Sequence, residues 1–292
     1  MWGVVAKIRP KAKDPIFFFF LSRPCYDELK MDKEGGAAAL VALSLIIQES
    51  LAQVKKSDIV ASSTMTMDLF LHVFKTCRED NFSSNESHEI EEAFGEAFLT
   101  FGLKVSLEDF KPLYYKLFSL ALDVENVASV STMFHITTLV GNKLKSLFSF
   151  VCEMIVQKAT TILHEASKEK LESKSDMLCY ILDALSSIFT FSRVDSLLMK
   201  SYEDHVNAIL EFLDGSYLDD KFLEKIKLCL GQLAATTDDE TQWKYLNYQV
   251  LMIIRNKSAK VCTYIRVLKL LYKHLKFFCK DPHLMRLILH IS

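Results

Sequence analysis

Apolar residues recur every three or four positions from Ala37 almost to the end of the chain, which is the period of an α-helix. Polar segments rich in Ser and Asp separate the apolar stretches, and these side chains can accept hydrogen bonds from the free N–H groups of the next helix. The pattern predicts helices over 37–55, 58–77, 87–102, 107–122, 127–147, 149–167, 174–191, 202–213, 220–235, 240–254, 258–277 and 282–290.

Two helices with their loops take about 40 residues, which is the period of HEAT-type repeats. We therefore expect an all-α protein. Residues 1–36 should form an irregular segment, and residues 37–292 an α-solenoid of stacked antiparallel HEAT-like helix pairs.

The composition agrees with this expectation. Half of the 292 residues are hydrophobic, and the 8 Gly and 5 Pro leave few turns for an all-β fold. The formal net charge of −2 argues against binding nucleic acid through overall charge, so an electrostatic function must come from local patches. The seven cysteines are odd in number and widely spread, which favours free thiols in a reducing compartment over a disulfide framework.

The apolar segments are too short to predict a membrane protein. The best continuous run, residues 37–47, falls well below the roughly 18 residues that cross a bilayer. Basic residues precede the apolar residues 16–21 as in a signal peptide, but this stretch is shorter than a typical signal core and no clear cleavage site follows. We expect an intracellular protein without a membrane partner.

The aromatic stretch at residues 106–118, SLEDFKPLYYKLF, raises the question of whether its rings stack on nucleic-acid bases or pack inside the fold. Ser106 and Asp109 resemble a capping box at the start of a helix. One helical face then carries Phe110, Leu113, Leu117 and Leu120, widened by Tyr114 and Phe118. This spacing favours packing between helices, with Pro112 bending the helix and Tyr115 on the outside.

The chain has no recognisable catalytic motif. It lacks a G-x-S-x-G turn, an H-E-x-x-H pair and a glycine loop for phosphates. Cys279 and His283 have a spacing that metal ligands use, but no second pair lies near them in the sequence. His135 and His164 have no neighbouring acid or nucleophile, so we interpret both as packing or surface residues. We predict no catalytic residue, no cofactor, no metal and no small-molecule substrate.

Charge is distributed unevenly along the chain. Seven acidic residues lie between Arg78 and Glu96, whereas residues 251–280 carry eight basic residues and no acidic one. The candidate binding residues of this basic stripe are Arg255, Lys257, Lys260, Arg266, Lys269, Lys273 and Lys276. An ordinary solvated helix face is one interpretation of the stripe. Contact with RNA phosphates and contact with an acidic protein partner remain the two functional ones.

Two motifs, about 125 residues apart, resemble a known family. The first consists of Phe110, Pro112, Leu113, Tyr114, Tyr115, Lys116, Leu117 and Phe118. The second consists of Trp243, Leu246, Asn247, Tyr248, Gln249 and Leu251. Over residues 66–261 the chain resembles the C-terminal domain of the HEAT repeat-containing protein 1 family, nucleolar scaffolds also called U-three small nucleolar RNA-associated protein 10.

The resemblance implies a non-enzymatic scaffold of the small-subunit processome, in the nucleolus, acting in pre-ribosomal RNA transcription and 18S RNA maturation. It implies β-propeller processome proteins as partners, with U-three small nucleolar RNA and pre-ribosomal RNA as further contacts. The alternative is a HEAT-like adaptor in transport or signalling that binds an acidic peptide or protein.

The chain departs from the family pattern at both ends. Residues 1–36 match no part of the family, and the resemblance ends after Val261, within the basic stripe. The long N-terminal solenoid of a full-length member is absent. These departures lead us to expect a fragment, a divergent product or an imperfect gene model.

Overall fold

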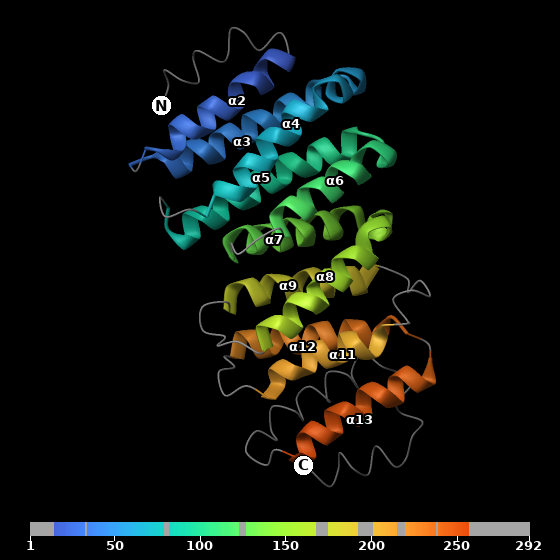
Figure 1. The fold of residues 1–292 in the computed structure, drawn as a ribbon. Coiled ribbons are helices and arrows are strands. Elements are labelled where there is room, and N and C mark those ends of the chain that lie inside the picture. The colour runs from blue at the N-terminus through green and yellow to red at the C-terminus, as the bar shows by residue number, and fades with distance from the viewer. Residues whose placement is uncertain are drawn as a thin grey trace. The chain divides into compact units, whose positions relative to one another are not determined.

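The computed structural model describes residues 15–256, apart from 33, 79–81, 123–126, 168–174, 192–200, 215–219 and 238. Its helices, in chain order and with η marking a 3₁₀ helix, are α2 (Pro15–Lys30), α3 (Gly36–Gln53), α4 (Lys56–Thr76), α5 (Ser84–Lys104), α6 (Leu107–Leu122), α7 (Val127–Leu144), η1 (Lys145–Phe148), α8 (Ser149–Ser167), α9 (Ser175–Phe191), α11 (Tyr202–Leu210), η3 (Glu211–Asp214), α12 (Asp220–Ala235) and α13 (Glu240–Asn256) (Figure 1). The described ranges contain no strand. The all-α prediction is therefore confirmed.

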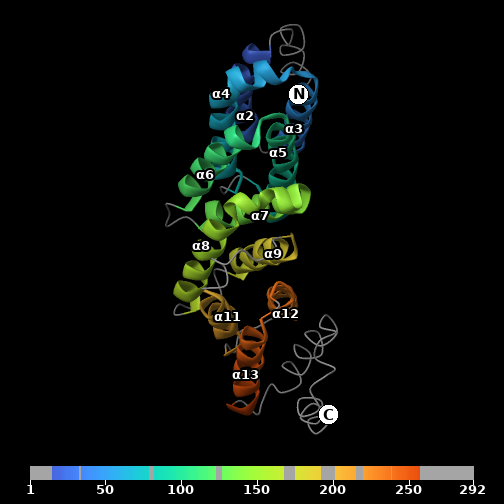
Figure 2. The same ribbon diagram turned by 90° about the vertical axis from the view of Figure 1, so that its right-hand side faces the viewer.

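The chain divides into two compact units between Lys143 and Leu144. In the first unit, α2 pairs with α3 and α4 with α5, while α2 also packs on α4, α3 on α5 and α4 on α6. Every second helix therefore lies in the same layer, and Figure 2 shows α4 and α6 on one side of this unit and α3 and α5 on the other. This is the helix-pair stacking expected of a HEAT-like solenoid.

The second unit repeats the same order of contacts. Helix α8 pairs with α9 and packs on α11, α9 packs on α12, and α11 packs on α13. The two layers of this unit are therefore α8, α11 and α13 on one side and α9 and α12 on the other (Figure 2).

Local sequence signals explain where several helices begin and end. Ser83 accepts a hydrogen bond from the Glu86 N–H, and the Glu86 carboxylate accepts one from the Ser83 N–H, which forms a capping box before α5. The Ser106 hydroxyl accepts from the Asp109 N–H at 3.1 Å and opens α6. At the end of α3, the Lys104 ammonium donates to the Ala52 carbonyl at 2.7 Å, where a positive charge complements the helix dipole.

The prediction of an irregular segment over residues 1–36 is wrong for α2. Pro15 is the first residue of this helix, where its missing N–H removes no hydrogen bond. Tertiary contacts hold the helix despite a second proline, Pro24, inside it. The Tyr26 ring packs edge to face on Phe94 at 5.7 Å, and its hydroxyl bonds the Thr76 hydroxyl at 3.1 Å.

The predicted helix over 127–147 is interrupted. Lys145 has a φ of 51°, a left-handed conformation that cannot continue a right-handed α-helix, so α7 ends at Leu144 and the short η1 follows. Similarly, the predicted helix over 202–213 turns into the 3₁₀ turn η3 after Leu210. The predicted helices over 258–277 and 282–290 lie outside the described residues.

Two helical segments are long and apolar enough to cross a membrane by length and composition, Gly36–Gln53 and Val127–Ser167. Core helices of soluble proteins satisfy the same criterion. Helix α3 buries Leu40, Leu43 and Ile47 inside the first unit, and the second segment is broken at Lys145.

Candidate functional site

The aromatic residues of the first motif form the core of the first unit. The rings of Phe110, Tyr114 and Phe118 are at most 1% exposed and follow one another along α6 at centroid distances of 5.9 and 6.2 Å. They continue to Phe98 on α5 at 5.6 Å and to Phe134 on α7 at 5.8 Å. The prediction that these rings pack helices is confirmed, because buried rings cannot stack on nucleic-acid bases.

The other residues of the first motif lie nearer the surface. Leu117 is buried, Leu113 is half-buried and Pro112 is exposed. Tyr115 is half-buried rather than fully outside, and the Lys111 ammonium lies 5.8 Å from its ring centroid. The motif therefore shapes one packed helix with a mixed outer face.

The second motif lies on α13 in the second unit and has both a buried and an exposed side. Leu246 and Asn247 are buried, whereas Trp243 and Gln249 are half-buried. The Trp243 indole N–H donates to the Thr237 carbonyl at 2.9 Å, which fixes the start of the helix. Tyr248 is 57% exposed, so it is the member of this motif that a partner can reach.

The candidate basic stripe is not tested by the structure. Arg255 lies on α13, but its side chain is not described, and Lys257, Lys260, Arg266, Lys269, Lys273 and Lys276 lie outside the described residues. Cys262, Cys279 and His283 fall outside them as well. The stripe stays a prediction.

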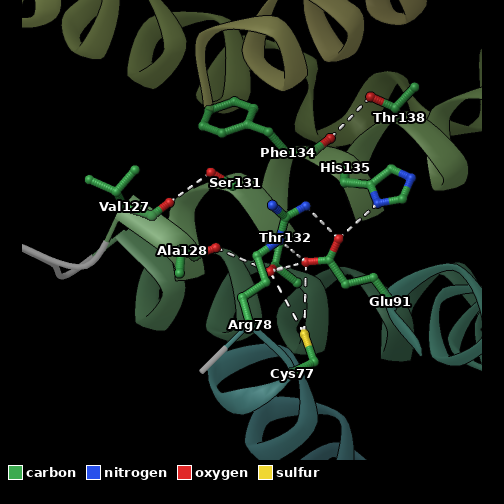
Figure 3. A network of polar contacts seen from close by, with 10 residues as sticks. All are labelled: Cys77, Arg78, Glu91, Val127, Ala128, Ser131, Thr132, Phe134, His135 and Thr138. Atoms are coloured by element: carbon green, nitrogen blue, oxygen red, sulfur yellow. Dashed lines mark hydrogen bonds and ion pairs between the residues drawn. The ribbon is translucent and has the colours of Figure 1, made fainter. Parts of the chain in front are cut away.

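A buried carboxylate, Glu91, is the centre of a polar network that sequence reasoning did not predict. Its side chain is fully buried between α5, α7 and the C-terminal end of α4. The Arg78 guanidinium holds both carboxylate oxygens, with Nε on Oε1 and Nη2 on Oε2 at 2.6 Å (Figure 3). This two-point contact is the strongest geometry available to an arginine and a carboxylate.

Helix α7 contributes two further donors to the same carboxylate. The Thr132 hydroxyl donates to Oε1, and His135 Nδ1 lies 3.2 Å from Oε2 (Figure 3). The Cys77 thiol is 3.8 Å from Oε1 and 3.9 Å from the Thr132 hydroxyl. Four side chains from two other segments of the chain therefore converge on one charge.

Electrostatics explain why Glu91 stays ionised inside the protein. Burial alone raises its pKa, but the hydrogen bonds from His135, Arg78 and Thr132 and the charge of Arg78 outweigh burial and lower the pKa to about 2. Burial, together with the Glu91 charge, raises the pKa of the Cys77 thiol. Cys77 is therefore held as a neutral thiol, which is a poor nucleophile.

The network joins α5, α7 and the segment that follows α4. A catalytic pair needs a nucleophile or a base that faces a substrate, whereas Glu91 is sealed in and paired with a cation. Of the five cysteines that the structure describes, Cys77, Cys152, Cys179 and Cys229 are buried and Cys25 is half-buried.

His164 and His205 lie in the second unit. The His205 ring is buried and its Nδ1 lies 2.8 Å from the Thr160 hydroxyl, which also donates to the Val156 carbonyl. Burial lowers the pKa of His205 to about 4, so the ring is neutral near pH 7. His164 Nδ1 lies 3.0 Å from the Glu211 carboxylate, a partner that the sequence did not indicate.

Comparison with known proteins agrees with the architecture. Residues 58–197 match the BP28CT (NUC211) domain family. HEAT repeat-containing protein 1 of Homo sapiens is 25% identical over 235 residues, which cover 74% of this chain and 11% of that protein. The Drosophila melanogaster homolog is 26% identical over 182 residues, covering 59% and 9%, and the Danio rerio protein is 25% identical over 259 residues, covering 76% and 12%.

The chain thus spans 9 to 12% of the length of these three relatives. The domain match includes α6 with the first motif and every residue of the Glu91 network. The chain therefore matches the BP28CT (NUC211) domain family over residues 58–197 and is homologous to HEAT repeat-containing protein 1 over about 74% of its length.

Proposed function

We propose that the chain is a non-enzymatic scaffold in ribosome biogenesis, acting in the nucleolus as part of the small-subunit processome. The observation that carries this proposal is the homology to HEAT repeat-containing protein 1, which extends well beyond the matched domain. The processome role, the nucleolus and the contribution to 18S RNA maturation follow from the family resemblance and are the parts that experiments must test.

The architecture supports a scaffold. Stacked helix pairs expose an outer face on each helix, and several partners can share such a surface. Glu91, the buried carboxylate of the first unit, joins helices through its ion pair with Arg78. A protein that organises partners needs stable helix packing and exposed side chains, and both are present.

The proposed partners are β-propeller proteins of the processome, together with U-three small nucleolar RNA and pre-ribosomal RNA. The basic stripe is the proposed RNA contact, because lysines and arginines at helical spacing can follow a phosphate backbone. Tyr248, exposed on α13, is a proposed protein contact because tyrosines are enriched at the centres of interfaces.

The test is affinity purification of the tagged chain from nuclear extract, with and without ribonuclease. We expect processome proteins and U-three RNA to be recovered, and RNA-tethered partners to be lost after ribonuclease. Recovery of transport or signalling factors, without processome proteins or U-three RNA, would contradict the proposal. It would favour an adaptor that binds an acidic peptide or protein.

A matched pair of variants separates the RNA contact from the scaffold role. The stripe variant carries Lys269→Glu, Lys273→Glu and Lys276→Glu. The control variant reverses exposed lysines outside the stripe, Lys111→Glu, Lys116→Glu and Lys158→Glu. We expect the stripe variant, and not the control, to bind RNA more weakly and with a smaller salt dependence. Each phosphate that a lysine neutralises makes the binding constant fall with nearly the first power of the salt concentration, so removing these lysines reduces that slope.

A further inference from the structure

The Glu91 network lies beside a second histidine, and together they form an arrangement of metal-ligand type. His88 and Glu91 are three residues apart on α5, so their side chains leave the same helix face. His135 reaches the pair from α7, and the His88 and His135 rings are stacked within 18° of parallel at a centroid distance of 4.7 Å. Because an imidazole nitrogen binds a metal in the plane of its ring, the surface ring of His88 has to turn about its side-chain torsions before both nitrogens meet one ion. One ligand atom from each residue lies within 4.8 Å of the others.

We propose that His88, Glu91 and His135 bind a divalent transition-metal ion of the zinc type. This inference does not depend on the proposed function in ribosome biogenesis. Two imidazole nitrogens and one carboxylate oxygen are the donor set that zinc accepts, and a water molecule completes a four-coordinate site.

The distance between the two buried ligands fits such an ion without movement of the helices. Zinc bonds to nitrogen and oxygen are about 2.0–2.2 Å long, which separates two tetrahedral ligands by roughly 3.3 Å. His135 Nδ1 and Glu91 Oε2 are 3.2 Å apart. An ion can therefore replace the proton on His135 Nδ1, and the metal-bound ring keeps one proton on Nε2. A neutral ring reaches this state by moving its proton from Nδ1 to Nε2, whereas a doubly protonated ring releases one proton to solvent.

The surroundings of Glu91 match those of a ligating carboxylate. Such carboxylates are themselves held by hydrogen bonds, which orient the oxygen that faces the metal. Arg78 Nε and the Thr132 hydroxyl hold Oε1 and leave Oε2 directed toward His135. When the ion binds Oε2, Arg78 Nη2 gives up its 2.6 Å contact with that oxygen and keeps the one between Nε and Oε1.

The charge of Arg78 sets the strength of the site. A guanidinium next to a divalent cation is repulsive, so binding should be weaker than in a site made for zinc alone. The exposed Glu89 and Glu92 on the same helix offset part of this repulsion and attract cations to the surface. His88 is more exposed than Glu91 and His135, so the ion enters from its side.

The test is isothermal titration of Zn²⁺ into the full chain after removal of metal by a chelator. We expect saturable binding of a single ion near neutral pH, weakening as the pH falls because the imidazoles must lose their protons. His88→Ala should lower the affinity at least about tenfold. His164→Ala, which removes a half-exposed histidine in the other unit, should leave it unchanged.

Co²⁺ gives a second readout that separates this site from the cysteines. Binding through nitrogen and oxygen produces no thiolate-to-cobalt charge-transfer band in the near-ultraviolet. If His88→Ala alters the far-UV circular dichroism, His88→Gln replaces it as a variant of similar length. The proposal is overturned if Zn²⁺ binding is absent, if it survives unchanged in the His88 variant, or if the Co²⁺ complex shows the thiolate band.

Discussion

Replacement of Glu91 is the most direct test of how the first unit is held together. Glu91→Gln keeps the shape of the side chain but removes the charge that Arg78 and His135 face. Removing one member of a buried ion pair costs about 3–5 kcal/mol, because the remaining charge stays buried without compensation. Arg78 is 16% exposed, so water relieves little of this cost.

The pKa gives a second, independent magnitude. An ordinary glutamate pKa of 4.5 against about 2 in the folded protein corresponds to about 3 kcal/mol of stability at neutral pH. Because the folded pKa is the lower one, this stability is fully present above pH 4.5 and is lost as the pH falls toward 2. Both routes lead to a loss of about 3 kcal/mol in Glu91→Gln at neutral pH.

The assay is urea unfolding followed by far-UV circular dichroism, with hydrogen exchange on the amides of α5 and α7 to locate the effect. Glu92→Gln is the matched control, because Glu92 is the next residue and is exposed, and we expect it to change stability by less than about 0.5 kcal/mol. The double variant Arg78→Met with Glu91→Leu should recover part of the loss. Equal unfolding free energies for Glu91→Gln and Glu92→Gln would refute the reasoning.

Three further predictions follow from burial. Burial lowers the pKa of His205 to about 4, so between pH 6.5 and pH 4 the unfolded chain binds a proton that the folded chain does not. The free energy of unfolding should therefore fall by up to about 3 kcal/mol from pH 6.5 toward pH 4. Urea unfolding at several pH values measures this fall, which should be absent in His205→Gln. Gly95→Ala places a Cβ 2.7 Å from the Leu139 side chain and should destabilise by about 1–3 kcal/mol. Gly231→Ala places a Cβ that meets no atom within 4 Å outside its immediate neighbours and the backbone of its own helix, and it should stabilise by about 0.5–1 kcal/mol. Thermal unfolding that ranks the two variants the other way would contradict the packing. Burial raises the pKa of Cys229 to about 12, so mass spectrometry after alkylation of the native protein should show the half-buried Cys25 modified before Cys229.

Periodicity in the sequence predicts the helices well because each buries one apolar face. The bounds predicted for 107–122 and 149–167 agree with α6 and α8 in the structure. Periodicity fails at residues 15–30, where two prolines and a short apolar cluster hide α2, whose order comes from tertiary contacts such as Tyr26 with Phe94. It also misses the break at Lys145, since a single left-handed residue leaves no trace in an apolar pattern.

The Glu91 network could not be predicted from the sequence, for a different reason. Its members are separated by up to 58 positions and meet only when α5 and α7 pack together. One signal was present. Glu91 lies on the same helical face as Ser87, Phe94 and Phe98, which are buried, and an acid on an apolar face requires a partner. The identity of that partner, Arg78, depends on the fold.

The measurement that tests the central claim most directly is pulse labelling of ribosomal RNA after depletion of this protein in cells. The proposed function predicts that the amounts of labelled 18S RNA and its precursors fall, while the amount of 28S RNA is less affected. Expression of a copy of the protein that resists the depletion should restore 18S RNA. Unchanged 18S maturation in depleted cells would contradict a role in the small-subunit processome.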